Sequence, residues 1–144
     1  MIKELLSQRG EPIFHLTAGD SSYIFSVFHG FLIHHYCGPQ ISDDDVEYLM
    51  IQVNHDSVVP HPADVEESWF SCDIAPFEYP ANATGDYRPS AISVRLAEKD
   101  NAFSGTTATE VRYVSHEIVT GKPKLDIQPA VYAEHDEADT LIVT

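Results

Sequence analysis

Two aromatic-rich runs separated by only two residues place the strongest constraint on what this chain can fold into. The runs are Ser21–Phe28 and Phe31–Cys37, and the residues between them are His29 and Gly30. Glycine adopts positive φ without steric cost, and histidine tolerates it better than most residues. Strand-like runs joined by such a pair predict a β-hairpin. Because both runs carry apolar residues on both faces, we expect other segments to cover the hairpin on each side.

The rest of the chain also predicts strands separated by long connections. Apolar runs or alternating patterns indicate strands at Pro12–Thr17, Trp69–Ile74, Ala91–Ala97, Glu110–Thr120 and Asp139–Thr144. A short helix is expected from Asp43–Asp45 to Met50, because acidic residues stabilise the positive end of a helix dipole. Asn101–Gly105 is typical of a turn. The last predicted strand has no closing turn, which suggests that the domain continues beyond it.

Acidic residues outnumber basic residues 23 to 8, which gives the 144-residue chain a formal net charge of −15. We therefore exclude nucleic acid and anionic membranes as partners, because each requires a positive surface. No apolar run approaches the ~18 residues of a membrane span, and the first residues show no secretory leader. Two cysteines, Cys37 and Cys72, are too few for a disulfide framework, so we expect a cytoplasmic protein with reduced thiols.

Reactive side chains form no recognisable active site in the sequence. Glycine-rich phosphate loops and the Gly-x-Ser-x-Gly motif are absent, so no cofactor and no serine nucleophile are predicted. Both cysteines have aromatic or apolar neighbours, which is typical of inert buried thiols. His34 and His35 point to opposite faces of a strand and cannot share an ion. The set His55, Asp56 and His61 has the donors of a divalent site, but its spacing matches no signature, so no metal is assigned.

Aromatic residues close to loop carboxylates fit a sugar-binding surface. Aromatic rings stack on the C–H faces of sugars, and carboxylates accept hydrogen bonds from sugar hydroxyl groups. For Trp69 and Phe70, a place in the core is favoured over a binding role. The chemistry alone favours a scaffold or recognition domain over a complete active site. The aromatic residues are Trp69, Phe70, Phe77, Tyr79 and Tyr87, and the acids are Asp56, Asp73, Glu78 and Asp86.

Four motifs occur in order along nearly the whole chain. The most specific is Phe77–Ala91, which contains Glu-Tyr-Pro, a glycine-containing turn and the sequence Asp-Tyr-Arg-Pro. The other three are the stretches Phe14–Gly38, Arg112–Leu125 and Pro129–Leu141. Together they resemble the N-terminal domain of the family-36 glycoside hydrolases, the bacterial α-galactosidases. We refer to Phe77–Ala91 as the signature segment.

The resemblance implies an all-β fold, the first part of an antiparallel β-supersandwich of the galactose-mutarotase-like kind. It implies retaining hydrolysis of terminal α-galactosides, such as melibiose and raffinose, by two aspartates of a following (β/α)₈ barrel. That barrel is not part of residues 1–144, so no catalytic residue is assigned and the isolated chain is expected to be inactive. The resemblance also implies a homo-oligomer, with a tetramer as the family's usual state.

Particular residues receive roles from the resemblance. A family aspartate that helps to shape the substrate site within the oligomer aligns with Asp56, whereas the arginine that accompanies it aligns with Ser68. Asp86 and Arg88 are expected to form an ion pair that locks the signature segment and presents Tyr87 to a neighbouring domain. A structural role for this pair is favoured over contact with substrate.

Two other functions stay open on the sequence. One is a free-standing carbohydrate-binding β-sandwich, which would have no barrel with two aspartates after it. The other is a structural or interaction domain that touches no sugar. Neither alternative accounts for the four ordered motifs.

Overall fold

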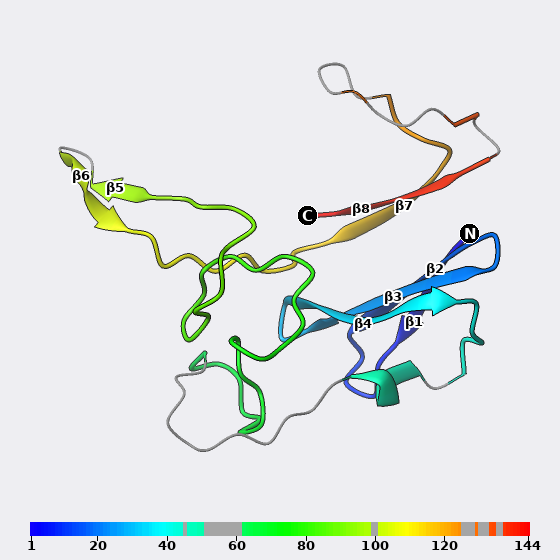
Figure 1. Cartoon of the computed structure of the whole chain (residues 1–144), viewed down its shortest axis with the longest axis horizontal. Helices are drawn as coiled ribbons and strands as arrows, with labels where there is room; N and C mark the ends of the chain where they lie inside the picture. Colours follow the sequence, from blue (N-terminus) through cyan, green and yellow to red (C-terminus); the bar gives the residue numbers. More distant parts are fainter. Residues whose placement is uncertain (45, 51–61, 99–100, 125–128, 130–132, 135–136) are drawn as a thin grey trace.

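A four-stranded antiparallel sheet forms the centre of the molecule in a computed structural model that describes residues 1–44, 46–50, 62–98, 101–124, 129, 133–134 and 137–144. The strands lie in the order β1-β2-β3-β4, so each pairs with its neighbour along the chain (Figure 1). No predicted strand corresponds to β1. The bounds are β1 (Ile2–Leu6), β2 (Pro12–Ala18), β3 (Ser21–Phe28) and β4 (Phe31–Pro39).

The predicted hairpin is confirmed as β3 and β4. His29 and Gly30 have φ angles of 49° and 79°, as a two-residue turn that matches the twist of the strands requires. Phe28 pairs directly with Phe31 across this turn. The residue types between the two aromatic runs therefore set the register of the hairpin.

A β-bulge interrupts β4 at His35. Phe25 pairs with His34, and the next residue of β3 towards its start, Ile24, pairs with Tyr36. His35 is therefore left without a partner in the ladder, and the alternation of side chains in β4 shifts by one residue. As a result, Ile33 before the bulge and Tyr36 after it pack on the same face of the sheet.

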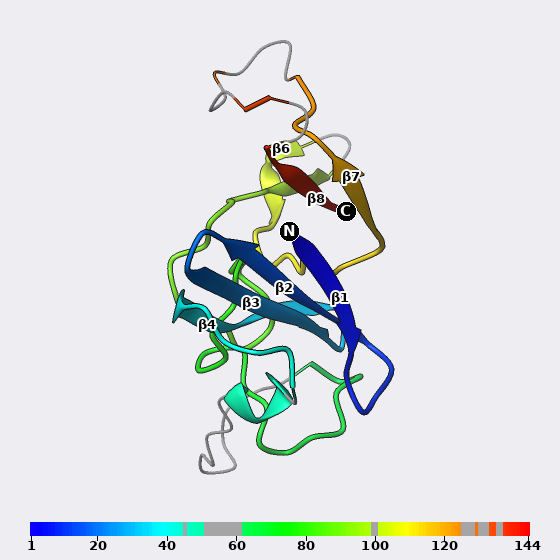
Figure 2. The same cartoon turned by 90° about the vertical axis from the view of Figure 1, so that its right-hand side faces the viewer.

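The β7–β8 hairpin covers one face of the sheet, where Phe14 and Phe25 are buried with their rings 5.1 Å apart. Its strands are β7 (His116–Thr120) and β8 (Asp139–Val143), which Figures 1 and 2 place over β1 to β3. Leu141 and Val143 of β8 pack against the two phenylalanines. This face of the central hairpin is therefore closed by the last strands of the chain.

The opposite face is covered by turns and by a single 3₁₀ turn, η1 (Val46–Leu49). Phe28 and Phe31 pack there against Phe70, which is 1% exposed, and Trp69 lies 5.3 Å from the ring of Phe28. The interpretation of Phe70 as a core residue is confirmed, and Trp69 is partly buried against the same cluster. The expectation that the hairpin is covered on both faces is also confirmed, because each face holds its own buried cluster.

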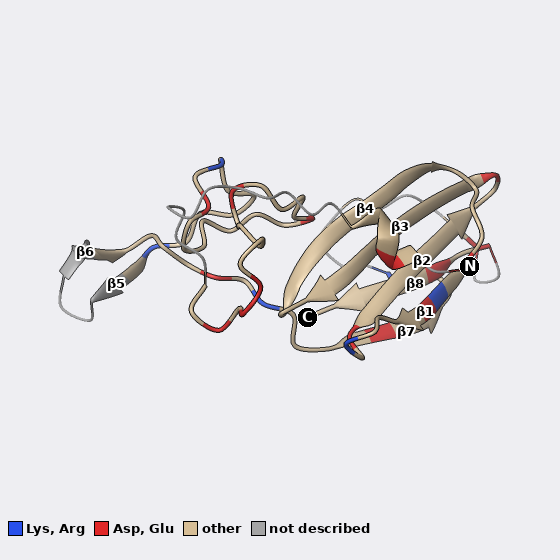
Figure 3. Cartoon of the chain, turned by 90° about the horizontal axis from the view of Figure 1, so that it is seen from below, with Lys and Arg blue, Asp and Glu red and all other residues tan. Residues whose placement is uncertain are grey.

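A two-stranded arm extends away from this body. It consists of β5 (Leu96–Glu98) and β6 (Asn101–Thr106). These two strands pair with each other and with no other strand of the described residues. Figures 1 and 3 show the arm projecting from the turns that follow the sheet. Leu96 at its base is 57% exposed.

Two predicted strands are wrong. Trp69–Ile74 forms consecutive turns, closed by hydrogen bonds such as that from the Ile74 N–H to the Ser71 carbonyl at 3.2 Å. Phe70 and Cys72 reach the core from these turns, whereas Ile74 is exposed. In Ala91–Ala97 only Leu96 and Ala97 are in a strand, where they pair with β6, and residues 91–95 are exposed and outside any strand.

Three further expectations need correction. Asn101–Gly105 is most of strand β6 and not a turn. In Glu110–Thr120 the strand begins only at His116, because the preceding residues cross to the hairpin turn, where the Tyr113 N–H donates to the Gly30 carbonyl at 2.7 Å. The expected helix is only η1, and Asp43 pairs with Lys3 and His15 instead of capping it.

The all-β fold class is confirmed, with three antiparallel sheets and no α-helix among the described residues. In that part of the chain no helix has the length and apolar character needed to span a membrane.

Candidate functional site

The signature segment lies along the outer edge of β4. The His34 N–H donates to the Pro76 carbonyl at 2.7 Å, and the Glu78 N–H donates to the Leu32 carbonyl at 2.9 Å. Phe77 therefore forms a β-bridge with Ile33. This pairing fixes the start of the signature segment to the rigid sheet and covers an edge that would otherwise expose unpaired backbone groups.

The carboxylate of Glu78 is held by two side chains of the sheet. The Tyr23 hydroxyl donates to one carboxylate oxygen, and Nδ1 of His34 lies 2.7 Å from the other. Burial of Tyr23 and its hydrogen bond to Glu78 together raise the pKa of the phenol. Because both oxygens of Glu78 have a partner, this carboxylate serves to orient the segment and not to accept a substrate proton.

A buried ion pair locks the turn at the centre of the signature segment. The Asp86 side chain is 0% exposed, and its Oδ1 accepts a hydrogen bond from Nε of Arg88 at 2.9 Å. Arg88 also donates to the carbonyls of Cys72 and Ala75, so one guanidinium ties the turn of the signature segment to the turns at residues 71–75. The predicted pair is confirmed, and Tyr87 between its partners is 74% exposed. Presentation of Tyr87 to another domain stays a prediction.

An open cleft of about 280 Å³ lies beside the signature segment. Residues of the signature segment, Phe77 and Tyr79, line it together with Arg112 and Tyr113. The guanidinium of Arg112 lies 3.9 Å from the centre of the Phe31 ring. Its donors are engaged by carboxylates and by the His29 carbonyl, so the cleft presents mainly apolar surface. Arg112 therefore holds neighbouring segments together, and its arrangement does not favour proton transfer in the cleft.

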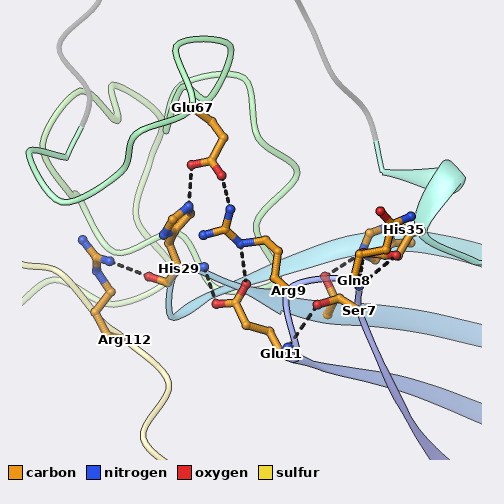
Figure 4. A network of polar contacts seen from close by, with 10 residues as sticks. Ser7, Gln8, Arg9, Glu11, His29, His35, Glu67 and Arg112 are labelled. Carbon is orange, nitrogen blue, oxygen red and sulfur yellow. Dashed lines mark hydrogen bonds and ion pairs between the residues drawn. The ribbon is translucent and has the colours of Figure 1, made fainter.

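A second polar network fastens residues 62–70 to the tip of the hairpin (Figure 4). Nε2 of His29 lies 2.6 Å from Oε2 of Glu67, and Arg9 donates to the other oxygen. The His29 N–H donates to Glu11 at 2.8 Å. Burial raises the pKa of Glu67, but the bond to His29 and the nearby charges outweigh it and lower the pKa overall. The network therefore contains a charged carboxylate at neutral pH.

Ser22, His15 and Asp43 form a hydrogen-bonded chain that sequence reasoning missed. His15 is 1% exposed, with Nε2 at 2.7 Å from Oγ of Ser22 and Nδ1 at 2.6 Å from Oδ1 of Asp43. These are the residue types of a hydrolytic triad. However, Ser22 is 2% exposed and its Oγ already accepts the Ile41 N–H. A substrate has no access to it, so the chain fastens the connection after β4 to the sheet.

Metal binding finds no support among the described residues, where no group of three or more potential ligands occurs. The prediction that His34 and His35 act separately is confirmed, because His34 contacts Glu78 while Nε2 of His35 lies 2.7 Å from Oγ of Ser26. Burial and the neighbouring imidazole lower the pKa of His35 to about 4. Three residues named in the sequence analysis, His55, Asp56 and His61, lie outside the described residues.

The two cysteines differ in their exposure to solvent. Cys72 is buried, and burial raises the pKa of its thiol to about 12, which confirms it as inert. Cys37, near the end of β4, is exposed, so the expectation of a buried thiol is wrong there.

Comparison with known proteins decides the family. Residues 30–144 match the Glycosyl hydrolase family 36 N-terminal domain, which is most of the chain. The chain belongs to this family. The family-36 match covers β4, the signature segment and the β7–β8 hairpin, so it includes the parts of the molecule described above.

Similar proteins carry the same assignment. The chain is 38% identical over 130 residues to alpha-galactosidase AgaA of Geobacillus stearothermophilus, covering 89% of this chain and 17% of that protein. The crystal structure of AgaA in complex with raffinose matches 91% of this chain with a TM-score of 0.75 at 37% identity. The galactosidase domain of the alpha-galactosidase-sucrose kinase AgaSK matches 98% of it with a TM-score of 0.79 at 29% identity. The family-36 chain therefore spans about one sixth of these relatives.

Replacing Asp86 with asparagine tests the lock in the signature segment. The variant leaves the Arg88 guanidinium without its buried charge partner, so we expect the free energy of unfolding to fall by about 1–3 kcal/mol. Urea denaturation followed by circular dichroism measures the change. Asp64→Asn is the matched control, because the Asp64 side chain is 66% exposed and its pairing with Arg112 contributes little. Equal losses in both variants would refute a structural lock.

A pH dependence follows from Asp43. The hydrogen bond from Lys3, joined by that from His15, holds the pKa of Asp43 below its ordinary value of 3.8. Its contribution to stability is therefore complete above pH 3.8 and is lost as the pH falls through the lowered pKa. Urea denaturation at a series of acidic pH values should show a smaller loss of stability in Asp43→Asn than in the wild type. Asp20→Asn, on the exposed turn before β3, should behave as the wild type.

Proposed function

We propose that residues 1–144 are the first part of the N-terminal domain of an α-galactosidase that hydrolyses terminal α-galactosides with retention of configuration. The observation that carries the proposal is the match of residues 30–144 to the family-36 N-terminal domain. The 38% identity to AgaA, whose crystal structures include complexes with raffinose and stachyose, supports galactosides such as raffinose and melibiose as substrates.

In this proposal the domain itself performs no catalysis. Among the described residues, the buried carboxylate of Asp86 is paired with Arg88, and the half-buried carboxylate of Glu78 is held by Tyr23 and His34. Retaining hydrolysis requires two carboxyl groups about 5–5.5 Å apart with access to the sugar. The reactive aspartates would therefore lie in a (β/α)₈ barrel elsewhere on the polypeptide. The domain would support that barrel and contribute contacts to a cytoplasmic homo-oligomer.

Asp56 is proposed to take part in substrate binding. In the sequence it lies between η1 and residues 62–70, and the His29–Glu67 contact fastens the latter residues to the tip of the hairpin. Such a carboxylate would accept hydrogen bonds from sugar hydroxyl groups at the substrate entrance. Ser68 stands where the family often has an accompanying arginine, so Asp56 would act without that partner.

Hydrolysis of a chromogenic α-galactoside tests the assignment. The complete polypeptide that contains this domain should release the chromophore, and the purified chain of residues 1–144 should not. The contrast follows from the location of both reactive aspartates outside this chain. Hydrolysis by the purified chain, or a complete polypeptide that acts only on another glycoside, would contradict the proposal.

Replacing Asp56 with alanine in the complete enzyme tests the substrate contact. Loss of hydrogen bonds to the bound sugar should raise KM for raffinose several-fold, while kcat changes less, because the reacting groups are untouched. Asp44→Ala, on the connection before η1, is the matched acidic control. A KM equal to that of the control would exclude a role for Asp56.

A further inference from the structure

Exposed apolar side chains are concentrated between residues 74 and 96, which we call the 74–96 surface. Tyr87 is 74% exposed and Leu96 is 57% exposed, in a chain of only 144 residues with a large excess of acidic groups. Between these bounds, however, the two acidic residues are balanced by two arginines. Protein interfaces are depleted of charge and enriched in tyrosine at their centres. The large apolar residues of this surface are Ile74, Tyr79, Tyr87, Ile92, Val94 and Leu96.

The backbone beneath this surface is held in place by hydrogen bonds. The Asp86–Arg88 pair locks its central turn, and the Ala91 N–H donates to the Pro80 carbonyl at 2.7 Å. Nδ2 of Asn82 donates to the Thr107 carbonyl at 2.7 Å, which ties the segment to the residue that directly follows β6. An aromatic side chain on a fixed turn binds a partner with little loss of conformational entropy. Tyr87 is therefore presented in a preorganised way.

The arm next to this surface also needs a partner. An isolated two-stranded hairpin is at best marginally stable in water, and β5 and β6 pair with no other strand of the described chain. The solved galactosidase domain of AgaSK nevertheless matches 98% of this chain, and this match accounts for only 19% of that domain. A fold similar to this chain therefore occurs within a longer polypeptide, and the other four-fifths of that polypeptide are available to cover the arm.

We propose that the 74–96 surface, of which Tyr87 is the most exposed large apolar residue, docks onto the remainder of the same polypeptide. This inference rests on the proposed function, which supplies a large catalytic part as the occupant. A neutral, apolar surface suits a permanent contact, because permanent interfaces are more apolar than transient ones. The larger part of a polypeptide like the AgaSK domain, of which this chain would be about one fifth, is such a permanent neighbour.

Photo-crosslinking in the complete enzyme tests the docking surface. The photoreactive residue p-benzoylphenylalanine replaces Tyr87 in one variant and Tyr48 in the control, because Tyr48 is equally exposed at 75% but lies on η1. After irradiation, the variant at position 87 should retain the mass of one polypeptide and yield crosslinked peptides from beyond residue 144. A band of twice that mass would assign the surface to a second copy and overturn the proposal. Crosslinking no greater than at position 48 would also overturn it.

A pair of double variants gives an independent measurement. Tyr87→Ala with Leu96→Ala should lower the melting temperature of the complete enzyme by several degrees more than Tyr48→Ala with Leu6→Ala, since Leu6 is 67% exposed at the end of β1. Equal shifts would contradict docking. Activity of the unmodified enzyme on a chromogenic α-galactoside separates the two proposals. If activity is absent, the proposed function fails even when the crosslink forms, and if activity is present without a crosslink, only the docking surface fails.

Discussion

The structure depends on one constraint, which is that the β3–β4 hairpin has apolar side chains on both faces and cannot be stable with either face in water. Burial of such side chains provides about 25 cal/mol per Å² of apolar surface, so each uncovered face would forfeit a large part of the stability. Phe14 and Phe25 on one face require β8, and Phe28 and Phe31 on the other require the turns that contain Phe70. Segments distant in sequence are thereby gathered around a hairpin that forms locally.

Histidine–carboxylate contacts hold these covering segments in place. Each joins the central sheet or its turn to a segment that lies over it, and in each the carboxylate comes from the excess of acidic residues in the chain. An imidazole can donate an N–H to a carboxylate from either ring nitrogen, and these contacts use both, which suits histidine to junctions between segments of different geometry. The contacts are His15 with Asp43, His29 with Glu67 and His34 with Glu78, and β7 is joined to β1 by His116 with Glu4.

Local features were predictable from the sequence, and features made by distant segments were not. The turn at His29 and Gly30 follows from adjacent residues, and the Asp86–Arg88 pair joins residues two apart. The strand predicted at Trp69–Ile74 was wrong because apolar residues in turns that pack against a sheet give the same short apolar run as a buried strand. The pattern alone cannot distinguish the two. The chain from Ser22 through His15 to Asp43 spans connections of 7 and 28 residues, which only the pairing of β2 with β3 and the path after β4 bring together.

The bulge at His35 has a consequence for how sequences of this family are aligned. Odd-numbered residues of β4 face the turns before the bulge, as Ile33 does, and even-numbered residues face them after it, as Tyr36 does. A homologue that lacks the inserted residue would keep the same buried pattern only if its gap falls at this position. A gap placed one or two residues away would align buried side chains of one sequence with exposed side chains of the other. Positions that are equally buried in both proteins would then seem to differ in hydrophobicity.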